Sequence, residues 1–207
     1  MRGAGPVRLA VLASGVGTNL QAIIDAVRAK KLRRVELALV LSDKAHAHAV
    51  VRAQRAGIPT VFVHPPGFRT RRAFERDVVR HLKAYRIDLI ALAGFMRILS
   101  PQFCQLYEDR ILNVHPSLLP SFKGSHALRD ALAYGVRVTG VTVHFVTAEL
   151  DGGPVILQDA VRVFPHDTED TLIARVHRVE HRLYPRAIQM VADQKVKVRK
   201  GKAVFKR

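Results

Sequence analysis

The chain of 207 residues is 48% hydrophobic and 25% charged, which suits one sizeable folded domain and excludes intrinsic disorder. Its 34 lysines and arginines exceed its 17 aspartates and glutamates, so the formal net charge is +17 and polyanions are candidate ligands. The single cysteine, Cys104, excludes an internal disulfide, and no apolar run is long enough to span a membrane. We therefore expect a cytoplasmic protein.

Predicted strands and helices alternate along the first half of the sequence. Apolar runs, typical of strands buried on both faces, lie at residues 7–13, 35–41, 60–63, 87–93 and 111–114. Amphipathic stretches between them predict helices at 20–29, 45–56 and 70–85, and Pro101 after Ser100 predicts a further helix start. This alternation predicts an α/β fold with a single doubly wound, mostly parallel sheet of the Rossmann-like type. Ligands of such a sheet gather at the carboxyl ends of its strands.

A glycine turn separates the first predicted strand from the first helix. Residues 14–19 read Ser-Gly-Val-Gly-Thr-Asn, and the free N–H groups at the start of the following helix form an anion site. Gly15, Gly17 and the later Asp43 also match part of a dinucleotide-binding fingerprint. However, Leu20 replaces the third glycine, and Asp43 lies later than the usual ~20 residues. We therefore expect a single phosphate here rather than a dinucleotide.

The central stretch, residues 111–153, holds the candidate reactive centre. Asn113 and His115 lie two apart on a predicted strand, so their side chains point to the same side. An amide and an imidazole at the end of a strand can bind an oxyanion. After a second apolar strand at 138–146, a turn brings in Asp151, which can orient the ring of His115 and favour its charged form. The alternative is that these three polar residues only satisfy turns beside strands.

The last part of the chain adds an antiparallel element and a long helix. A helix is expected at 127–134, and a strand at 155–164 that pairs antiparallel with 138–146. Thr168 caps a helix that extends to residue 192. Valines and lysines alternate over 195–205, which predicts a small hairpin. We expect one domain at 1–194, followed by a basic tail at 195–207.

Two histidine patterns invite a metal interpretation. His46 and His48 form an H-x-H pair, but on a helix they would face different directions. His177, Glu180 and His181 fit the H-x-x-E-H pattern of a zinc peptidase family, which requires a further ligand, and no glutamate follows Glu180. We expect no metal at either place.

Five segments together point to one family. They read ASGVGTNLQAI, LAGFMRILSP, NVHPSLLPSFKG, HFVTAELDGGPVILQ and VEHRLYP, in this order along the chain. The sequence resembles the glycinamide ribonucleotide formyltransferases, the folate-dependent enzymes of purine synthesis. The resemblance implies transfer of a formyl group from the co-substrate 10-formyltetrahydrofolate to the amine of 5′-phosphoribosylglycinamide. The amine attacks the formyl carbon directly, so no protein nucleophile is required.

The resemblance also implies catalytic and substrate-binding residues. The catalytic positions of the family are matched by Asn113, His115 and Asp151. The positions that hold the phosphate and the ribose hydroxyls of the ribonucleotide are matched by Gly17, Thr18, Asn19 and Glu180. Val16 departs from the family pattern, because many members carry asparagine there, and one possible side-chain contact is therefore absent.

The folate is assigned to two further segments by the same resemblance. Arg71 matches an arginine that meets the folate tail, which would account for a cation in the first turn of a helix, where the helix dipole disfavours it. The backbone that lines the pterin pocket in the family corresponds here to Met96, Arg97, Ile98 and Leu99. Asn113 is implied to lie against the same co-substrate.

Other enzymes that use 10-formyltetrahydrofolate are the nearest alternatives. Methionyl-tRNA formyltransferases would suit the basic surface, but they carry a second domain for which we expect no room in this chain. Formyltetrahydrofolate hydrolases carry an N-terminal regulatory domain, and residues 1–7 are too few to form one. A nucleic-acid-binding module is supported by charge alone, and the basic residues are scattered. We expect small-molecule substrates, no specific nucleic acid and no membrane partner.

Overall fold

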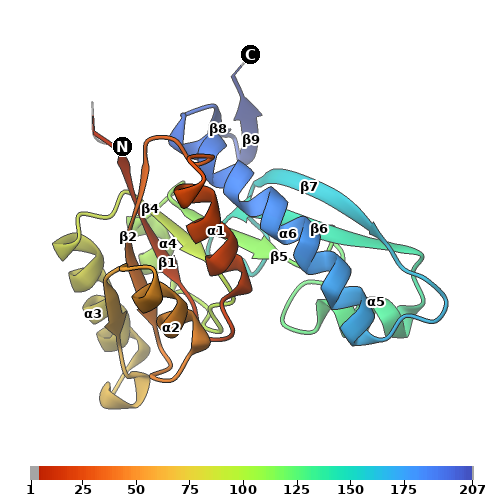
Figure 1. The fold of residues 1–207 in the computed structure, drawn as a ribbon, viewed down its shortest axis with the longest axis horizontal. Helices are drawn as coiled ribbons and strands as arrows, with labels where there is room; N and C mark the ends of the chain where they lie inside the picture. The colour runs from red at the N-terminus through yellow and green to blue at the C-terminus, as the bar shows by residue number, and fades with distance from the viewer. Residues whose placement is uncertain (1–4, 207) are drawn as a thin grey trace.

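A seven-stranded sheet runs through the middle of the computed structural model, which describes residues 5–206 (Figure 1). Its strands are β1 (Val7–Leu12), β2 (Val35–Ser42), β3 (Thr60–Phe62), β4 (Leu89–Leu92), β5 (Ile111–His115), β6 (Val138–Phe145) and β7 (Val155–Arg162). Their order across the sheet is β3-β2-β1-β4-β5-β6-β7. The first five strands are parallel, whereas β6 pairs antiparallel with both β5 and β7. The predicted doubly wound, mostly parallel sheet is therefore confirmed.

Helices cover both faces of this sheet. They are α1 (Thr18–Arg28), α2 (His48–Arg55), α3 (Arg71–Ala84), α4 (Pro101–Leu106), α5 (Ala127–Tyr134), α6 (Glu169–Ala192) and a short 3-10 helix, η1 (Pro65–Gly67). Figure 1 shows α1 and α6 side by side on one face, while α3 and α4 cover the other. Leu9 and Val11 pack beneath α1 and α6, and Ala10 and Leu12 beneath α3 and α4. Helices therefore bury both faces of the sheet. Because successive strand residues point to opposite faces, nearly every residue of such a strand is apolar, which explains the apolar runs.

The second helix begins later than its sequence pattern predicts. A helix was expected over 45–56, but α2 starts only at His48. The residues before it form a turn, in which the Ala47 N–H donates to the Lys44 carbonyl at 3.3 Å, and Ala47 itself is extended. No side chain caps this helix. The late start lets Ala49, in the first turn, pack on the glycine turn after β1.

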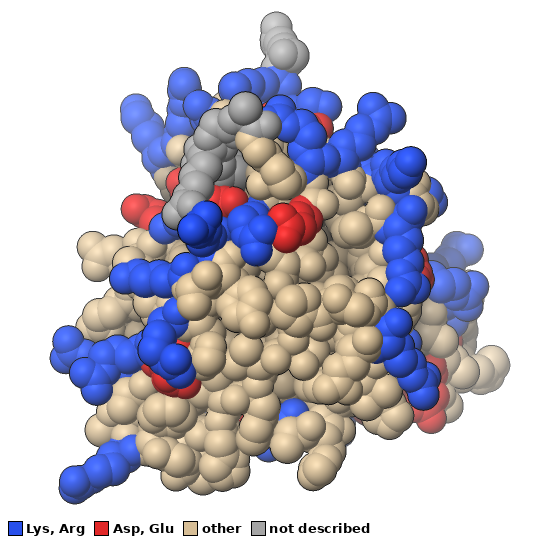
Figure 2. Space-filling view, turned by 60° about the vertical axis from the view of Figure 1, so that its left-hand side comes forward, with Lys and Arg blue, Asp and Glu red and all other residues tan. Residues whose placement is uncertain are grey.

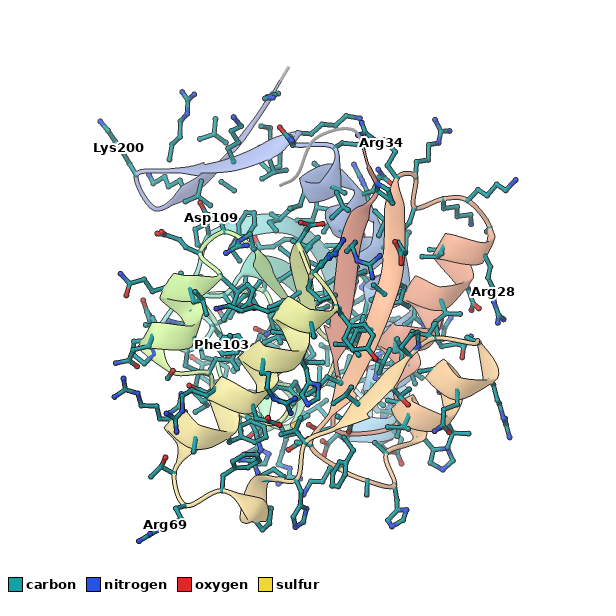
Figure 3. All side chains as sticks on the ribbon, turned by 90° about the vertical axis from the view of Figure 1, so that its left-hand side faces the viewer. Arg28, Arg34, Arg69, Phe103, Asp109 and Lys200 are labelled. Carbon is teal, nitrogen blue, oxygen red and sulfur yellow. The ribbon has the colours of Figure 1, made fainter. Side chains whose placement is uncertain are left out.

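The C-terminal residues form a separate antiparallel hairpin of β8 (Val196–Arg199) and β9 (Lys202–Phe205). Lys200 and Gly201 make its two-residue turn, and both have positive φ, as the right-handed twist of a hairpin favours. Figure 3 shows Lys200 and Arg34 at one end of the molecule and Arg69 at the other. Since Arg34 directly precedes β2, the hairpin lies toward the amino ends of the parallel strands.

Basic side chains are spread over the surface. Figure 2 shows lysines and arginines around the rim of one face, with few acidic residues among them and a broad uncharged centre. Within residues 5–206, no helix combines the length and the apolar character needed to cross a membrane.

Candidate active site

The carboxyl ends of neighbouring parallel strands bring the predicted site residues to one edge of the sheet. The glycine turn follows β1, the segment 93–99 follows β4, and Asn113 and His115 lie at the end of β5. These three strands are adjacent in the sheet. Leu92 of β4 lies opposite Asn113, and the Ser14 N–H donates to the Gly94 carbonyl at 3.1 Å. The candidate phosphate loop, pterin segment and reactive centre are therefore contiguous.

Asn113 faces a histidine that the sequence patterns did not single out. Asn113 is paired with His144 of β6, and 3.4 Å separate Asn113 Nδ2 from His144 Nε2. His144 Nδ1 donates to the Phe145 carbonyl at 2.8 Å. Burial lowers the pKa of His144, against the opposite effects of that carbonyl and of Asp151. The ring is therefore neutral near pH 7, and its Nε2 accepts from the Asn113 amide and orients it. The available signal was the only ionisable residue in a predicted strand of apolar residues, threonines and glycine, VTGVTVHF.

His115 lies between a carboxylate and a backbone carbonyl. The residue is 4% exposed, and its Nδ1 is 3.5 Å from Asp151 Oδ2. Its Nε2 donates to the Phe122 carbonyl at 2.8 Å. The other oxygen of Asp151 is 3.7 Å from His144 Nε2. One buried carboxylate thus faces two imidazole rings, at distances where charge rather than a directed hydrogen bond dominates.

Asp151 is held by a backbone hydrogen bond from the loop after β5 and by the tight packing of its own turn against β6. Its Oδ2 accepts the Gly124 N–H at 2.9 Å, which ties the turn after β6 to the loop after β5. Asp151 has a φ of 49°, a conformation that aspartate tolerates better than most residues. Gly153 approaches β6 so closely that a Cβ there would lie 1.8 Å from the Phe145 carbonyl oxygen. The glycine after this turn is therefore a steric requirement.

The loop after His115 is anchored on β6 and β7. The Thr142 hydroxyl donates to the Ser117 carbonyl at 2.7 Å and accepts the Leu119 N–H at 3.0 Å. Gln158 of β7 donates to the Leu119 carbonyl at 2.9 Å, and the Leu119–Pro120 peptide is cis. These bonds fix the base of the loop that carries the Phe122 carbonyl to His115.

The glycine turn after β1 has the backbone geometry of a helix start that can bind an anion. Gly17 is the N-cap of α1, with a φ of 75° and no side-chain cap, so the first N–H groups of the helix point into the turn. Thr18 is the first residue of the helix. A Cβ on Gly17 would lie 2.8 Å from the Cα and Cβ of Ala49. Val16 is 62% exposed, and its carbonyl accepts from Arg52 Nε at 2.9 Å.

Asn19 and Glu180, predicted from opposite ends of the chain, contact each other. Asn19 Nδ2 donates to Glu180 Oε2 at 2.8 Å. Glu180 is 4% exposed, and burial raises the pKa of its carboxyl, although Asn19 and His177 act in the opposite direction. One turn later in α6, the Tyr184 hydroxyl lies 2.8 Å from the Leu92 carbonyl and 3.0 Å from that of Leu112. This contact fixes α6 over β4 and β5.

The H-x-x-E-H pattern does not form a metal cluster. His177 and His181 stack with ring centroids 5.7 Å apart, and His177 Nε2 is 3.9 Å from Glu180 Oε2. Within residues 5–206, no group of three or more histidine, cysteine, aspartate or glutamate side chains has metal-binding geometry.

The candidate folate residues lie on a partly exposed rim. Met96 is 72% and Ile98 62% exposed, whereas Leu99 is buried. Arg97 Nε pairs with Asp43 Oδ2 at 2.8 Å. Arg71 is half exposed and pairs with Glu75, and the same carboxylate accepts the N–H and the hydroxyl of Ser100. Arg71 is thereby connected to the end of the 96–99 segment.

A basic groove of about 920 Å³ runs between α1 and α6 and begins at Thr18. It includes none of the residues at the end of β5. The cations that line it are Lys31, Arg52, Arg178, Arg182, Arg186 and Lys195. Two of them are paired, Arg182 with Asp159 and Lys195 with Asp193.

Comparison with known proteins identifies relatives of the whole chain. The phosphoribosylglycinamide formyltransferase of Escherichia coli is 47% identical over 197 residues, which are 95% of this chain and 92% of that protein. A crystal structure of glycinamide ribonucleotide transformylase 1 from Symbiobacterium toebii is 43% identical with a TM-score of 0.95, covering 98% of this chain and 95% of the other. A formyltetrahydrofolate deformylase from Pseudomonas syringae is 30% identical with a TM-score of 0.90; the match covers 99% of this chain and 67% of the deformylase. The sequence profile of the formyl transferases matches residues 7–188, and the chain therefore belongs to the formyl transferase family.

Proposed function

We propose that this protein transfers a formyl group from 10-formyltetrahydrofolate to the amine of 5′-phosphoribosylglycinamide. The products are formylglycinamide ribonucleotide and tetrahydrofolate, and the step belongs to purine biosynthesis. The observation that supports the proposal is that Asn113 and His115, the proposed oxyanion-binding pair, lie at the same sheet edge as the helix start to which we assign the phosphate. Relatives named for this reaction match nearly the full chain.

The chemistry requires stabilisation of one developing charge. The substrate amine attacks the formyl carbon, and the formyl oxygen becomes an oxyanion. Collapse of this intermediate expels the folate nitrogen, which gains a proton while the attacking amine loses one. Asn113 has two N–H groups, of which His144 takes one, so the other can donate to the oxyanion. No metal takes part in this scheme.

His115 is the second donor in this proposal. The Asp151 carboxylate lies 3.5 Å from its Nδ1 and orients the ring. The Nε2 proton, however, is held by the Phe122 carbonyl. Donation from Nε2 to an oxyanion therefore requires the loop after β5 to withdraw that carbonyl.

The two substrates approach this centre from different strands. Gly17, Thr18 and Asn19 hold the phosphate, chiefly through backbone N–H groups, because the Asn19 amide already donates to Glu180. Glu180 accepts from the ribose hydroxyls through lone pairs that Asn19 leaves open. The co-substrate is held by the Arg71 guanidinium at its acidic tail. Its pterin lies against the backbone of Met96, Arg97, Ile98 and Leu99 and against Asn113.

An acceptor assay tests the proposal against its alternatives. Purified protein is supplied with 10-formyltetrahydrofolate and one of three acceptors: the ribonucleotide, methionyl-tRNA or water alone. We expect release of tetrahydrofolate that depends on the ribonucleotide. Release of tetrahydrofolate without an added acceptor would instead establish a hydrolase. Release that requires methionyl-tRNA would establish a tRNA formyltransferase. In this proposal the partners are small molecules, without a specific nucleic acid. A cytoplasmic location agrees with the single, unpaired cysteine.

A further inference from the structure

Asp43 is a buried carboxylate that the proposed chemistry does not use. It directly follows β2, and its side chain is 2% exposed. Its Oδ1 accepts the Ser14 hydroxyl at 2.6 Å, and its Oδ2 accepts Arg97 Nε at 2.8 Å. Both oxygens are therefore engaged by residues from two other loops, one after β1 and one after β4. These contacts commit Asp43 to two other loops of the protein.

The Ser14 hydroxyl connects Asp43 to the backbone of the candidate pterin segment through two hydrogen bonds. A hydroxyl has one proton, and here it is directed at Asp43. The oxygen lone pairs of Ser14 then accept the Met96 N–H at 3.0 Å. The carboxylate thus fixes which way the hydroxyl points, and the hydroxyl fixes the Met96 backbone.

The segment from Phe95 to Leu99 depends on this network more than the phosphate loop does. Among residues 5–206, the Met96 N–H makes the only hydrogen bond of the 95–99 backbone. The phosphate loop has anchors on α2 that are independent of Asp43. The Ala49 N–H donates to the Gly15 carbonyl at 3.1 Å, and Arg52 donates to that of Val16.

The side chain of Arg97 is committed to the same network. Its guanidinium carbon lies 5.1 Å from the centre of the Phe74 ring, and Nε pairs with Asp43. This geometry holds the arginine along the protein surface. In this proposal, Arg97 therefore contacts a bound folate through its backbone, and its side chain serves to hold that backbone in place.

We infer that Asp43 is a positioning residue for the folate: through Ser14 and Arg97 it holds the 95–99 backbone in the shape that binds the pterin. The inference rests on the proposed function, because it assigns the pterin to this segment. It predicts that loss of the Asp43 charge weakens folate binding selectively. The phosphate loop keeps its α2 anchors, so ribonucleotide binding changes little.

The experiment compares Asp43→Asn, Arg97→Met and the wild type by calorimetric binding of tetrahydrofolate and by steady-state kinetics. An asparagine amide cannot accept from both Ser14 and Arg97, so we expect about tenfold weaker tetrahydrofolate binding, which is about 1.4 kcal/mol. The KM for 10-formyltetrahydrofolate should rise by a similar factor. The KM for the ribonucleotide and kcat should stay within about twofold. The double variant should be little worse than Asp43→Asn alone, since Arg97→Met removes one of the two contacts that Asp43→Asn already disturbs.

Glu36→Gln is the matched control. Glu36 pairs with Arg8 at 2.7 Å near the opposite ends of the same strands, so this variant removes a comparable ion pair away from the site. It should leave every constant unchanged. If Asp43→Asn does not fold, its two contacts are tested one at a time: Arg97→Met, at a 40% exposed position, removes the pair with Asp43, and Ser14→Ala removes the hydroxyl between Asp43 and Met96.

Two outcomes would overturn the inference: unchanged tetrahydrofolate affinity in Asp43→Asn (or, where that variant does not fold, in both Arg97→Met and Ser14→Ala), or equal losses for both substrates. A wild type that binds tetrahydrofolate but transfers nothing to the ribonucleotide would refute the proposed function, while the affinities would still decide the role of Asp43. A wild type that binds no tetrahydrofolate would refute both.

Discussion

Replacement of Glu180 by glutamine should stabilise the folded protein and weaken its substrate binding. Glu180 is 4% exposed, and burial raises the pKa of its carboxyl. The Glu180→Gln variant keeps the size of the side chain and an acceptor for Asn19, which donates at 2.8 Å. Only the charge is lost.

The direction of the stability change follows from the sign of the pKa shift. A carboxyl whose pKa is higher in the folded than in the unfolded protein is more costly to ionise after folding. It therefore destabilises the fold at every pH above its folded pKa, and this penalty disappears as the pH falls toward the unfolded value. Each unit of such a shift corresponds to ~1.4 kcal/mol. A gain on the order of 1 kcal/mol at pH 7.5 would raise the Tm of a chain this size by about 2–4 °C.

The effect on binding has the opposite sign. Hydrogen bonds to a charged group contribute about 1.5–3 kcal/mol, so the KM for the ribonucleotide should rise about tenfold to about a hundredfold. The KM for 10-formyltetrahydrofolate should not change, because Glu180 does not touch the candidate folate segment. In the wild type, the ribonucleotide KM should also rise as the pH falls through the raised pKa of Glu180, whereas the variant lacks this step.

Melting curves and kinetics between about pH 5 and 8 test both parts. The phosphate of the substrate also titrates near pH ~6, so the ratio of variant to wild-type KM isolates the contribution of Glu180. Glu108→Gln, at an exposed position after α4, serves as the control. A variant with a lower Tm at pH 7.5 would refute the stability argument, and an unchanged ribonucleotide KM would refute the ribose assignment.

Three further variants or conditions probe other parts of the site. Gly17→Ala places a Cβ 2.8 Å from Ala49 at a positive φ. We expect at least a ~10-fold rise in the KM for the ribonucleotide and little change in the KM for the folate. Equal rises in both KM values would indicate that the loop has collapsed. Asp151→Asn removes the charge facing His115, and turnover should fall by ~10²–10³, the typical loss of an oxyanion donor; near-normal turnover would remove Asp151 from the catalytic centre. Because the basic residues are scattered, anisotropy titrations should find nucleic-acid binding that is non-specific and falls steeply with salt; tight binding to one defined RNA at physiological salt would contradict this.

Much of the fold could be predicted because local signals and packing agree. Thr70, Ser100 and Thr168 cap α3, α4 and α6 as their sequence positions indicate. The start of α2 could not be predicted in this way. Its position is set by the contact of Ala49 with Gly17, two residues that are far apart in sequence. A tertiary contact of this kind leaves no periodic signal in the chain.

The positions of site residues at strand ends could be predicted from the sequence. The hydrogen-bond partners of their side chains could not. Strand order alone brings Asn113 beside the segment after β4. The pairing of Asn113 with His144 depends on the register of an antiparallel strand, which apolar runs do not specify. The Phe122 carbonyl at His115 belongs to a loop whose path has no sequence signature.

The two histidines that face Asp151 have different hydrogen-bond partners. His144 uses Nδ1 to donate to the Phe145 carbonyl, so its Nε2 can accept from Asn113 only while the ring is neutral. A protonated His144 would turn an N–H toward Asp151 and lose its hold on the Asn113 amide. Burial lowers the pKa of His144 and prevents this near pH 7. The Asp151 carboxylate therefore faces a neutral His144 on one side and, at 3.5 Å, the Nδ1 of His115 on the other. In the proposed oxyanion site, the amide of Asn113 is thus oriented by a neutral histidine, whereas the ring of His115 is the one that lies against the carboxylate.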